Sequence, residues 1–246
     1  MQSTFTQSTF TQTTFNASLR CNGQSQSAGE SLNALSPDAL KDLAALQHPS
    51  SYPANSVVFA EKDAPQGVFL VLEGEIKLSM NSSDGRRLIL RIARKGELIG
   101  LTSTLTGSPY EMTAEAIYTS RVAFIARRDF IVFLASHPDV YQAITAELSR
   151  HYTKACEQLR NVGLSSSAPA KLARLLLDWS ENGQTTEAGT RFRFSLTHEE
   201  IGEFIGTSRE TVTRTLSVFK TRRLVNFKGS TLTIPNKTAL ASYAGF

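Results

Sequence analysis

Residues 196–225 read LTHEEIGEFIGTSRETVTRTLSVFKTRRLV, and this stretch predicts two short helices joined by a tight turn. Thr197 and Glu200 have the spacing of a capping box, a pair of side chains that starts a helix. Gly206 ends that helix and allows a sharp turn, and a hydroxyl residue at 207–208 caps the next helix. Two short helices joined by a short turn that contains Gly are typical of a helix-turn-helix.

Each of these helices is expected to bury one apolar face. The residues predicted to be buried are Ile201, Phe204 and Ile205 in the first helix and Val212, Leu216 and Phe219 in the second. At about 100° per residue, four residues of the second helix point away from its apolar stripe, and Arg209 lies on the flank. Those four residues are Glu210, Thr213, Arg214 and Ser217.

Side chains of these types suit the edges of base pairs and the phosphates beside them. Arginine binds guanine through two hydrogen bonds, and glutamate accepts one from the cytosine amino group. The predicted base-reading residues are Arg209, Glu210, Thr213 and Arg214. Hydroxyls, basic side chains and helix N-termini bind phosphates, and the predicted phosphate contacts are Thr197, His198, Ser208, Thr211, Ser217 and Lys220.

Two of these residues have simpler explanations. Glu210 is also a first-turn acid of the kind that the helix dipole favours, and Arg214 is also an ordinary solvated charge. The distribution of charge supports the DNA interpretation. The chain has a net charge of +4, but residues 204–246 contain seven basic side chains and one acidic side chain. Such a local excess is typical of a segment that binds a polyanion, here double-stranded DNA.

The rest of residues 168–246 is consistent with a winged helix-turn-helix domain. Leu172, Leu175, Leu176 and Trp179 form the stripe of one more helix, and residues 191–195 alternate like a short strand. Residues 224–234, with a turn at Lys228-Gly229, predict the hairpin wing. A protein-interaction winged helix, in a ligand-sensing module that acts on a protein partner, is the competing hypothesis.

From about Tyr52 to Ala126 the sequence consists of short apolar runs separated by Gly, Pro or Asp, which is typical of an antiparallel sandwich or roll. The runs are Val57–Ala60, Val68–Leu72, Ile76–Met80, Leu88–Ala93 and Val122–Ala126. Alternate positions are apolar in the third and fourth runs, and Asp84-Gly85 between them is a hairpin signal. The predicted fold class is therefore α+β, with an N-terminal, jelly-roll-like antiparallel β-roll. Chain reversals are expected at Gly74, Gly96, Gly100 and Gly107.

His137-Pro138-Asp139 predicts the start of a long helix. Its apolar residues follow at alternating spacings of three and four, like the seam of a coiled coil between two copies of the chain. The predicted dimer contacts are Tyr141, Ile144, Leu148, Tyr152, Ala155 and Leu159, followed by Val162. An amphipathic helix packed on its own domain is the alternative. Gly163 and residues 165–167 predict a hinge.

Residues 2–16 are three near-identical pentads, and the polar composition up to about Gly29 predicts a disordered tail. The expected domains are a tail at 1–30, a sensor roll at 31–135, a dimerisation helix at 136–164 and a DNA-binding domain at 168–246. The chain has no apolar run long enough for a membrane span and no secretory signal, so we expect a cytoplasmic protein.

Several other classes are excluded by composition. The two cysteines, Cys21 and Cys156, are too few for a disulfide framework or a four-thiolate cluster. Cys156, on the expected dimer helix, is interpreted as an inert packed cysteine, with thiol oxidation as the alternative. The four histidines are dispersed, and no catalytic motif is present. We therefore predict no cofactor, no metal and no enzymatic activity.

Residues 196–225 resemble the DNA-binding motif of the Crp/Fnr transcription-regulator superfamily, and the SRETVTR heptad at 208–214 is a specific match. The resemblance extends over about residues 35–236. It implies a cyclic-nucleotide-binding-type roll, a dimer helix and a winged helix-turn-helix, in a homodimer that binds a palindromic operator and, as an activator, RNA polymerase. The implied half-site is like TGTGA or TTGAT. Arg209 favours the former, with half-sites about one helical turn (~34 Å) apart.

In the nucleotide-binding members of this superfamily, a glycine-bounded segment supplies a Glu for the ribose and an Arg-Ser pair for the phosphate. The matching segment, residues 96–116, keeps the glycines, but Leu101 stands near the Glu position and Tyr110-Glu111 replaces Arg-Ser. The residues predicted to line the effector pocket are Gly96, Leu98, Gly100, Leu101, Tyr110, Glu111 and Met112.

No basic residue lies between Lys95 and Arg121, whereas three carboxylates do. A buried phosphate would therefore lack a paired cation. We predict a sensor domain that does not bind cAMP in the usual way and whose effector is another small molecule or absent. A cAMP-responsive regulator with a rearranged phosphate site, served by Arg86, Arg87 or Arg91, is the alternative.

Overall fold

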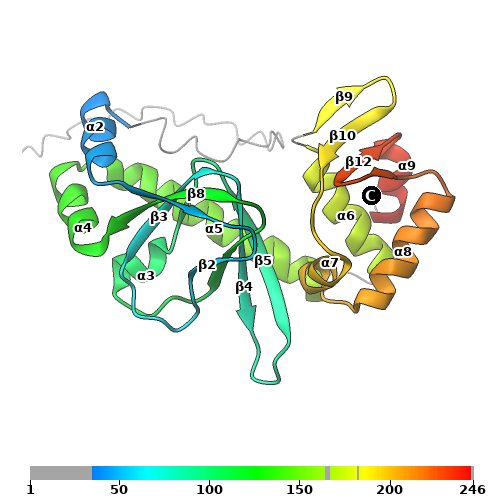
Figure 1. Cartoon of the computed structure of the whole chain (residues 1–246), viewed down its shortest axis with the longest axis horizontal. Coiled ribbons are helices and arrows are strands. Elements are labelled where there is room, and N and C mark those ends of the chain that lie inside the picture. Colours follow the sequence, from blue (N-terminus) through cyan, green and yellow to red (C-terminus); the bar gives the residue numbers. More distant parts are fainter. Residues whose placement is uncertain (1–34, 164–166, 182, 245–246) are drawn as a thin grey trace, which may run out of the picture.

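The computed structural model describes residues 35–163, 167–181 and 183–244. The pentad repeats, Cys21 and residues 164–166 of the expected hinge lie outside this described part. An N-terminal β-roll and a C-terminal domain are joined by the long helix α5 (Val140–Gly163), as Figure 1 shows. The predicted α+β class, and the order of roll, long helix and helix-turn-helix, are confirmed. Among the described helices, none has both the length and the apolar character to cross a membrane.

The roll contains two antiparallel sheets, ordered β1-β8-β3-β6 and β2-β7-β4-β5. Their strands are β1 (His48–Tyr52), β2 (Val57–Phe59), β3 (Gly67–Glu73), β4 (Glu75–Asn81), β5 (Arg87–Arg94), β6 (Leu98–Ile99), β7 (Thr113–Ala116) and β8 (Ser120–Ala126). Each of the five expected apolar runs forms a strand. The other three strands were not expected, because β1 is largely polar, β7 has alanine as its only apolar residue type and β6 has two residues.

Three short helices belong to the roll: α2 (Pro37–Ala45), α3 (Leu101–Thr106) and α4 (Arg127–Ser136). Ser36 caps α2 by accepting a bond from the Ala39 amide. Helix α3 lies between Gly100 and Gly107, which have φ values of 73° and 78°. This left-handed backbone favours glycine because it lacks a Cβ. The expectation of chain reversal at both glycines is thereby confirmed.

The roll has two layers of core. Aromatic and aliphatic residues between the two sheets, including Phe59, Phe69 and Leu78, form one cluster. A second cluster joins β3 and β8 to α2, α4 and the start of α5, with Phe130 and Ile144 among its buried members. Burying side chains of this size stabilises the fold by about 1.5–3 kcal/mol each. The N-terminal part of α5 is therefore fixed to its own roll.

The alternation of apolar residues in β4 and β5 does not match their burial. Lys77 and Ser79 are 3% and 0% exposed, although both occupy polar positions of β4. In β5, Ile89 is fully buried, whereas its neighbours Leu88 and Leu90 are only half-buried. Two causes are visible: the β4–β5 register shifts between Leu78 and Ser79, and the outer face of this sheet is covered by other elements rather than by water.

The C-terminal domain combines four helices with one antiparallel sheet ordered β11-β12-β10-β9 in the described residues. The elements are α6 (Ala168–Ser180), β9 (Gln184–Thr186), β10 (Gly189–Arg193), α7 (His198–Ile205), α8 (Arg209–Thr221), β11 (Asn226–Lys228), β12 (Thr231–Ile234) and α9 (Lys237–Ala244). The expected wing is β11–β12, and it turns at Gly229, where φ is 60°. Helix α9 and strand β9 were not expected from the sequence.

The two domains share a core. Ile92 of β5 and Ile117, which follows β7, belong to the same buried cluster as Trp179 of α6. Arg94 lies over the ring of Trp179 at 5.4 Å, and Arg193 of β10 lies over Tyr118 at 3.9 Å. Cation–π contacts of this kind strengthen when they are shielded from water. The roll therefore holds the C-terminal domain through direct packing as well as through α5.

Candidate nucleic-acid interface

The helix-turn-helix is held by the caps that the sequence predicts. The Thr197 hydroxyl accepts from the Glu200 amide at 3.2 Å, and the Glu200 carboxylate accepts from the Thr197 amide at 2.8 Å. Gly206 ends α7 with φ 65°, and Ser208 caps α8 by accepting from the Thr211 amide at 3.3 Å. These reciprocal bonds satisfy backbone donors that a helix N-terminus leaves free. All of these bonds join residues within three positions of each other, so they fix the start of both helices through local contacts.

A residue that sequence reasoning missed makes the turn possible. A Cβ added to buried Gly202 would lie 2.7 Å from the Thr207 carbonyl oxygen, which is closer than real Cβ contacts. The Thr207 amide in turn donates to the Gly202 carbonyl at 2.9 Å. Backbone from the turn thus packs directly on α7, and only glycine allows that approach. The buried position of Gly202 among apolar residues could have signalled this.

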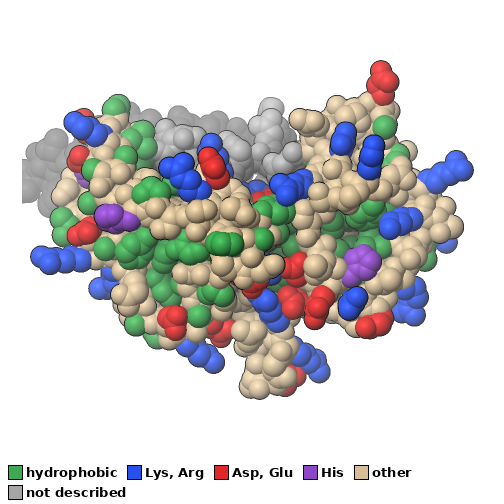
Figure 2. Space-filling model, in the orientation of Figure 1, with side chains coloured by type: hydrophobic (Ala, Val, Ile, Leu, Met, Phe, Trp, Pro, Cys, Tyr) green, Lys and Arg blue, Asp and Glu red, His purple; other side chains and the backbone are tan. Residues whose placement is uncertain are grey.

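The polar face of α8 is exposed as predicted. Val212, Leu216 and Phe219 are buried, whereas the outward residues are exposed, namely Arg209, Glu210, Thr213, Arg214 and Ser217. Neither Arg209 nor Arg214 has an ion-pair partner in the described chain. On the face shown in Figure 2, Lys and Arg side chains lie over and around α8 at the outer edge of the C-terminal domain. Two unpaired guanidinium groups on one exposed helix are available to base edges.

Glu210 differs from the arginines because its carboxylate is already engaged. A hydrogen bond from its own backbone amide, together with one from Ser208, holds the pKa of Glu210 below its usual value. These bonds stabilise a carboxylate in the first turn of α8, which is the simpler explanation of Glu210 given in the sequence analysis. The Glu210 carboxylate has further lone pairs, so it can cap α8 and still accept a hydrogen bond from a base.

The predicted phosphate contacts surround this face. The Lys220 ammonium lies 4.8 Å from the ring of Phe227 in the wing, and the Ser217 hydroxyl donates to the Thr213 carbonyl at 2.9 Å. Thr211 is half-buried, with its hydroxyl 3.2 Å from that of Ser208. Thr197 is exposed. His198, the first residue of α7, lies 2.8 Å from the Thr213 hydroxyl.

Helix α7 is also attached to the roll by a buried lysine that sequence reasoning did not connect with it. The Lys77 ammonium lies 2.6 Å from Glu200 and 2.7 Å from Glu115 of β7, and Arg87 reaches Glu115 at 2.7 Å. Burial by itself raises the pKa of Glu200 and of Glu115, but the hydrogen bonds from these cations outweigh it and leave both pKa values below the usual range. The capping residue of α7 thus doubles as an interdomain contact.

Replacement of Lys77 with Met should lower the free energy of unfolding by about 3 kcal/mol. This is the lower end for breaking a buried ion pair, because Glu115 keeps Arg87 and Glu200 keeps Thr197. Urea unfolding measures the change, and Lys95→Met, at an exposed lysine, is the matched control with an expected change of about 0.5 kcal/mol or less. Equal losses in the two variants would show that the Lys77 contact does not hold the domains.

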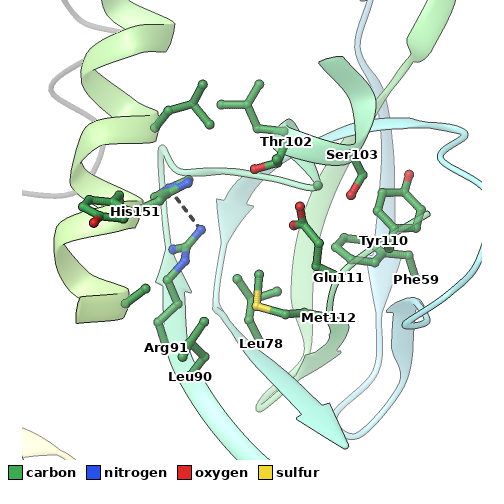
Figure 3. A pocket seen from close by; sticks show the side chains of 15 residues that line it. Phe59, Leu78, Leu90, Arg91, Thr102, Ser103, Tyr110, Glu111, Met112 and His151 are labelled. Atoms are coloured by element: carbon green, nitrogen blue, oxygen red, sulfur yellow. Dashed lines mark hydrogen bonds between the residues drawn. The ribbon is translucent and has the colours of Figure 1, made fainter. Parts of the chain in front are cut away.

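A second feature of the structure is a cavity of about 250 Å³ between the roll and α5. Five of the predicted pocket residues line it, and Gly96 and Leu98 do not. Leu98 instead packs in the core cluster on the other side of its sheet. The five are Gly100, Leu101, Tyr110, Glu111 and Met112, and Figure 3 shows the last three beside Phe59.

The cavity contains one of the three arginines that the sequence analysis named as the alternative source of a cation. Arg91 of β5 lines the cavity, and its guanidinium lies 3.1 Å from His151 of α5 (Figure 3). Arg91 also donates to Glu97, and Lys154 lies 3.7 Å from the same carboxylate. Arg91 comes from the neighbouring strand β5, so the search for basic residues between Lys95 and Arg121 did not include it. The Arg91 charge is, however, already paired.

The acidic side chains are also arranged differently from the expectation. Glu97 is paired with Arg91, and Glu115 faces Lys77 and Arg87, so only Glu111 of the three lines the cavity. Burial raises the pKa of Glu111. The Tyr110 hydroxyl is engaged as well, because it donates to the Gly67 carbonyl at 2.7 Å while the ring stacks on Phe59 at 4.1 Å.

His151 belongs to a polar network that links the cavity to α5. Its Nε2 atom lies 3.0 Å from Glu147, and Arg150 donates to the same carboxylate. Burial raises the pKa of Glu147, but His151 and Arg150 outweigh this effect and lower it to about 2. Ligating atoms of Glu97, Glu147 and His151 lie within 4.8 Å of one another, with the Arg91 guanidinium bonded to two of these side chains.

Comparison with known families assigns the two domains. The profile of the cyclic nucleotide-binding domain matches residues 49–137, and that of the Crp-like helix-turn-helix domain matches residues 170–243. Both matches lie in the predicted order, on the roll and on the domain that carries α7 and α8. The chain belongs to the Crp/Fnr superfamily. Its helix-turn-helix is thus a DNA-binding element of a transcription regulator.

Relatives of this Crp/Fnr chain are transcription regulators. A CRP-like cAMP-activated global transcriptional regulator of Mycobacterium tuberculosis is 26% identical over 209 residues, which cover 85% of this chain and 93% of the relative. The nitrogen fixation regulation protein FixK of Azorhizobium caulinodans is 27% identical over 190 residues, covering 76% and 75%. The structure of FixK2 from Bradyrhizobium japonicum aligns with a TM-score of 0.72 at 23% identity, covering 80% of this chain and 96% of that one, which shows a shared fold.

The apolar stripe of the long helix of this Crp/Fnr chain is partly covered by the roll and partly exposed. Tyr141, Tyr152 and Leu159 are 50%, 73% and 63% exposed, and they follow one line along α5. Ile144, in contrast, is 4% exposed and packs in the roll core, and Leu148 packs against that core and lines the cavity. The roll buries Ile144, so the predicted seam is wrong at this residue, whereas Leu148 is half-buried and stays a predicted contact. Ala155 is half-buried and also lines the cavity.

Helix α5 begins at Val140 rather than at Pro138, because residues 138–139 form a turn. Near its other end, Gln158 is 5% exposed and donates to the Ile89 carbonyl at 3.0 Å and to the Phe204 carbonyl at 2.6 Å. This side chain links α5 to both domains. No sequence signal identified it, since a glutamine in a helix is usually exposed.

Proposed function

We propose that this chain is a homodimeric transcription regulator whose two α8 helices read a palindromic operator in adjacent major grooves. The observation that carries the proposal is the exposed, unpaired Arg209–Arg214 face of α8, beside a family match to a Crp-like helix-turn-helix. In a helix-turn-helix the second helix enters the major groove, and dimers place half-sites about one helical turn apart. Arg209 and Arg214 are the principal base readers, and a TGTGA-like half-site supplies guanine to both.

Dimerisation in this proposal uses Tyr141, Tyr152 and Leu159 of α5. Three large apolar side chains on one line of a helix are costly to leave in water, and a second copy of the same line covers them. The stripe from Tyr141 to Leu159 extends over most of α5. A contact of this length can align two subunits. When the regulator acts as an activator, RNA polymerase is the expected further partner.

Binding of double-stranded DNA can be tested by fluorescence anisotropy with a duplex that carries two TGTGA-like half-sites. The affinity should fall steeply as salt rises, because Lys220 and the helix N-termini displace counterions from phosphates. A scrambled duplex of the same composition is the control, and it should bind more weakly at every salt concentration. Binding that is independent of salt, or absent, would instead favour the protein-interaction hypothesis.

The roll of this regulator is proposed not to bind cAMP in the usual way. Arg91, the one arginine or lysine among the described residues that line the cavity, is paired with Glu97, and Glu111 adds an acidic group at the cavity. A cyclic phosphate would have to break a buried ion pair, which costs several kcal/mol. The effector is therefore a different small molecule, or DNA binding needs none.

Calorimetric titration with cAMP should detect a Kd no tighter than about 1 mM. Glu97→Gln is the informative variant, because it removes the partner of Arg91 and frees the guanidinium for a phosphate. We expect this variant to bind cAMP at least about tenfold more tightly than the unmodified chain, a gain of about 1.4 kcal/mol. Micromolar binding by the unmodified chain would establish the alternative, a rearranged phosphate site.

A further inference from the structure

The first residue of α7 makes an unusual contact with the recognition helix. His198 Nδ1 lies 2.8 Å from the Thr213 hydroxyl oxygen, and that hydroxyl lies 2.9 Å from the Arg209 carbonyl oxygen. A threonine hydroxyl has one hydrogen, which here is donated to the carbonyl one turn back in α8. We therefore assign the Thr213 oxygen as the acceptor from His198, which places the proton of the imidazole on Nδ1.

This tautomer decides what the other ring nitrogen can do. No residue in the described part of the chain bonds to His198 Nε2. In the neutral ring, with Nδ1 protonated, Nε2 carries a lone pair and acts only as an acceptor. A DNA phosphate also has only acceptors to offer. A neutral His198 held on Thr213 therefore repels the phosphate that it is placed to contact, and only the imidazolium donates to it.

Burial and the surrounding charges disfavour the imidazolium form of His198 in the absence of DNA. Partial burial and then the positive charges of Lys220 and Arg209, both on α8, lower the pKa of His198. The nearest acids on its own helix are Glu199, which is exposed, and Glu200, which is bonded to Lys77 and Thr197. A phosphate beside His198, Lys220 and the N-terminus of α7 raises the pKa of His198 again, because its negative charge pairs with the imidazolium.

We propose that His198 is a proton-dependent phosphate contact, which donates through Nε2 to operator DNA only as an imidazolium held on Thr213. This inference rests on the proposed function. In this proposal Thr213 has two roles: it positions His198, and it belongs to the base-reading face of α8. It also makes operator binding sensitive to pH in the neutral range, because each subunit takes up a proton when it binds.

The direction of the pH effect follows from the two protonation states. The pKa of His198 is higher in the complex than in the free protein, so the gain in affinity is complete below the free pKa. This gain in affinity is lost as the pH rises through the His198 pKa of the complex. Between the His198 pKa values of the free protein and of the complex, each subunit takes up one proton on binding. Each such proton lowers the affinity about tenfold for every pH unit of increase.

Anisotropy titrations of the full chain with the palindromic duplex, at constant ionic strength from pH 6 to pH 8.5, test this inference. The unmodified chain should lose affinity as the pH rises. His198→Lys should bind with a nearly flat pH profile, since its charge persists across the range. His198→Asn should be flat and weak, and His137→Gln, at a histidine paired with Asp42 in the roll, should keep the unmodified profile.

Imidazole nitrogen NMR of the unmodified chain gives a second test that needs no variant. At a pH above the His198 pKa of the free protein, the free ring should be protonated on Nδ1 only. At the same pH the operator complex should show a larger fraction of rings with both nitrogens protonated. Equal pH slopes for the unmodified chain and His198→Lys, or a free tautomer protonated on Nε2, would overturn the inference. Absence of duplex binding at every pH would instead overturn the proposed function, and this inference with it.

Discussion

Replacement of both Arg209 and Arg214 with alanine should remove the ability of this protein to distinguish its operator from random DNA. Each bidentate arginine–guanine contact contributes about 1–3 kcal/mol of discrimination. Both arginines are exposed and without ion-pair partners in the described chain, so their loss leaves no buried charge and does not affect the fold. Two contacts per subunit amount to a loss of at least about 2 kcal/mol per half-site.

Competition binding with a set of operator variants measures this effect. Each single variant should relax the preference at one base pair, and the double variant should bind operator and random duplexes almost equally. Lys220→Ala is the matched control, because a lost phosphate contact weakens all sequences alike and reduces the salt dependence. Retained preference in the double variant would mean that other residues of the chain read the bases.

Replacement of Leu159 with Glu should convert the proposed dimer into monomers. Leu159 is 63% exposed in the single chain, so the substitution does not disturb the packing of one subunit. In the dimer it would bury two carboxylates close to each other, and each unpaired buried charge costs several kcal/mol. A penalty of about 3 kcal/mol already raises the dimer Kd more than hundredfold.

Sedimentation velocity measures this change, and the affinity for a two-half-site duplex should fall in parallel because the two reading helices are no longer linked. Thr153→Glu is the matched control, since Thr153 is exposed on a different flank of α5. Leu148 is unsuitable for this purpose because it packs against the roll core. A Leu159→Glu protein that still sediments as a dimer would place the subunit contact elsewhere.

The parts of the structure that could be predicted are those that local sequence determines. Thr197, Glu200, Gly206 and Ser208 satisfy backbone groups within a few residues of themselves, and the structure confirms the caps and the turn that they predict. The strands of the roll follow apolar runs for a similar reason. Caps and apolar runs act over one helical turn or one strand, so their meaning does not depend on distant parts of the chain.

The contacts that sequence reasoning missed join residues far apart in the chain. Lys77 meets Glu200 across 123 positions, and Arg91 meets His151 across 60. A lysine at a polar position of an alternating strand is expected to face water, and only the approach of α7 buries it. The face of α5 illustrates the same limit: Ile144 and Leu159 follow one spacing, but the roll covers the first and not the second.

Selection of duplexes from a random DNA library by the full-length protein tests the central claim most directly. If two copies of the chain present α8 to one duplex, the recovered sequences should share a two-fold palindrome. Its half-sites should contain guanine and lie about one helical turn apart. Recovered sequences that match the starting library, or a single motif without its symmetric repeat, would contradict this account.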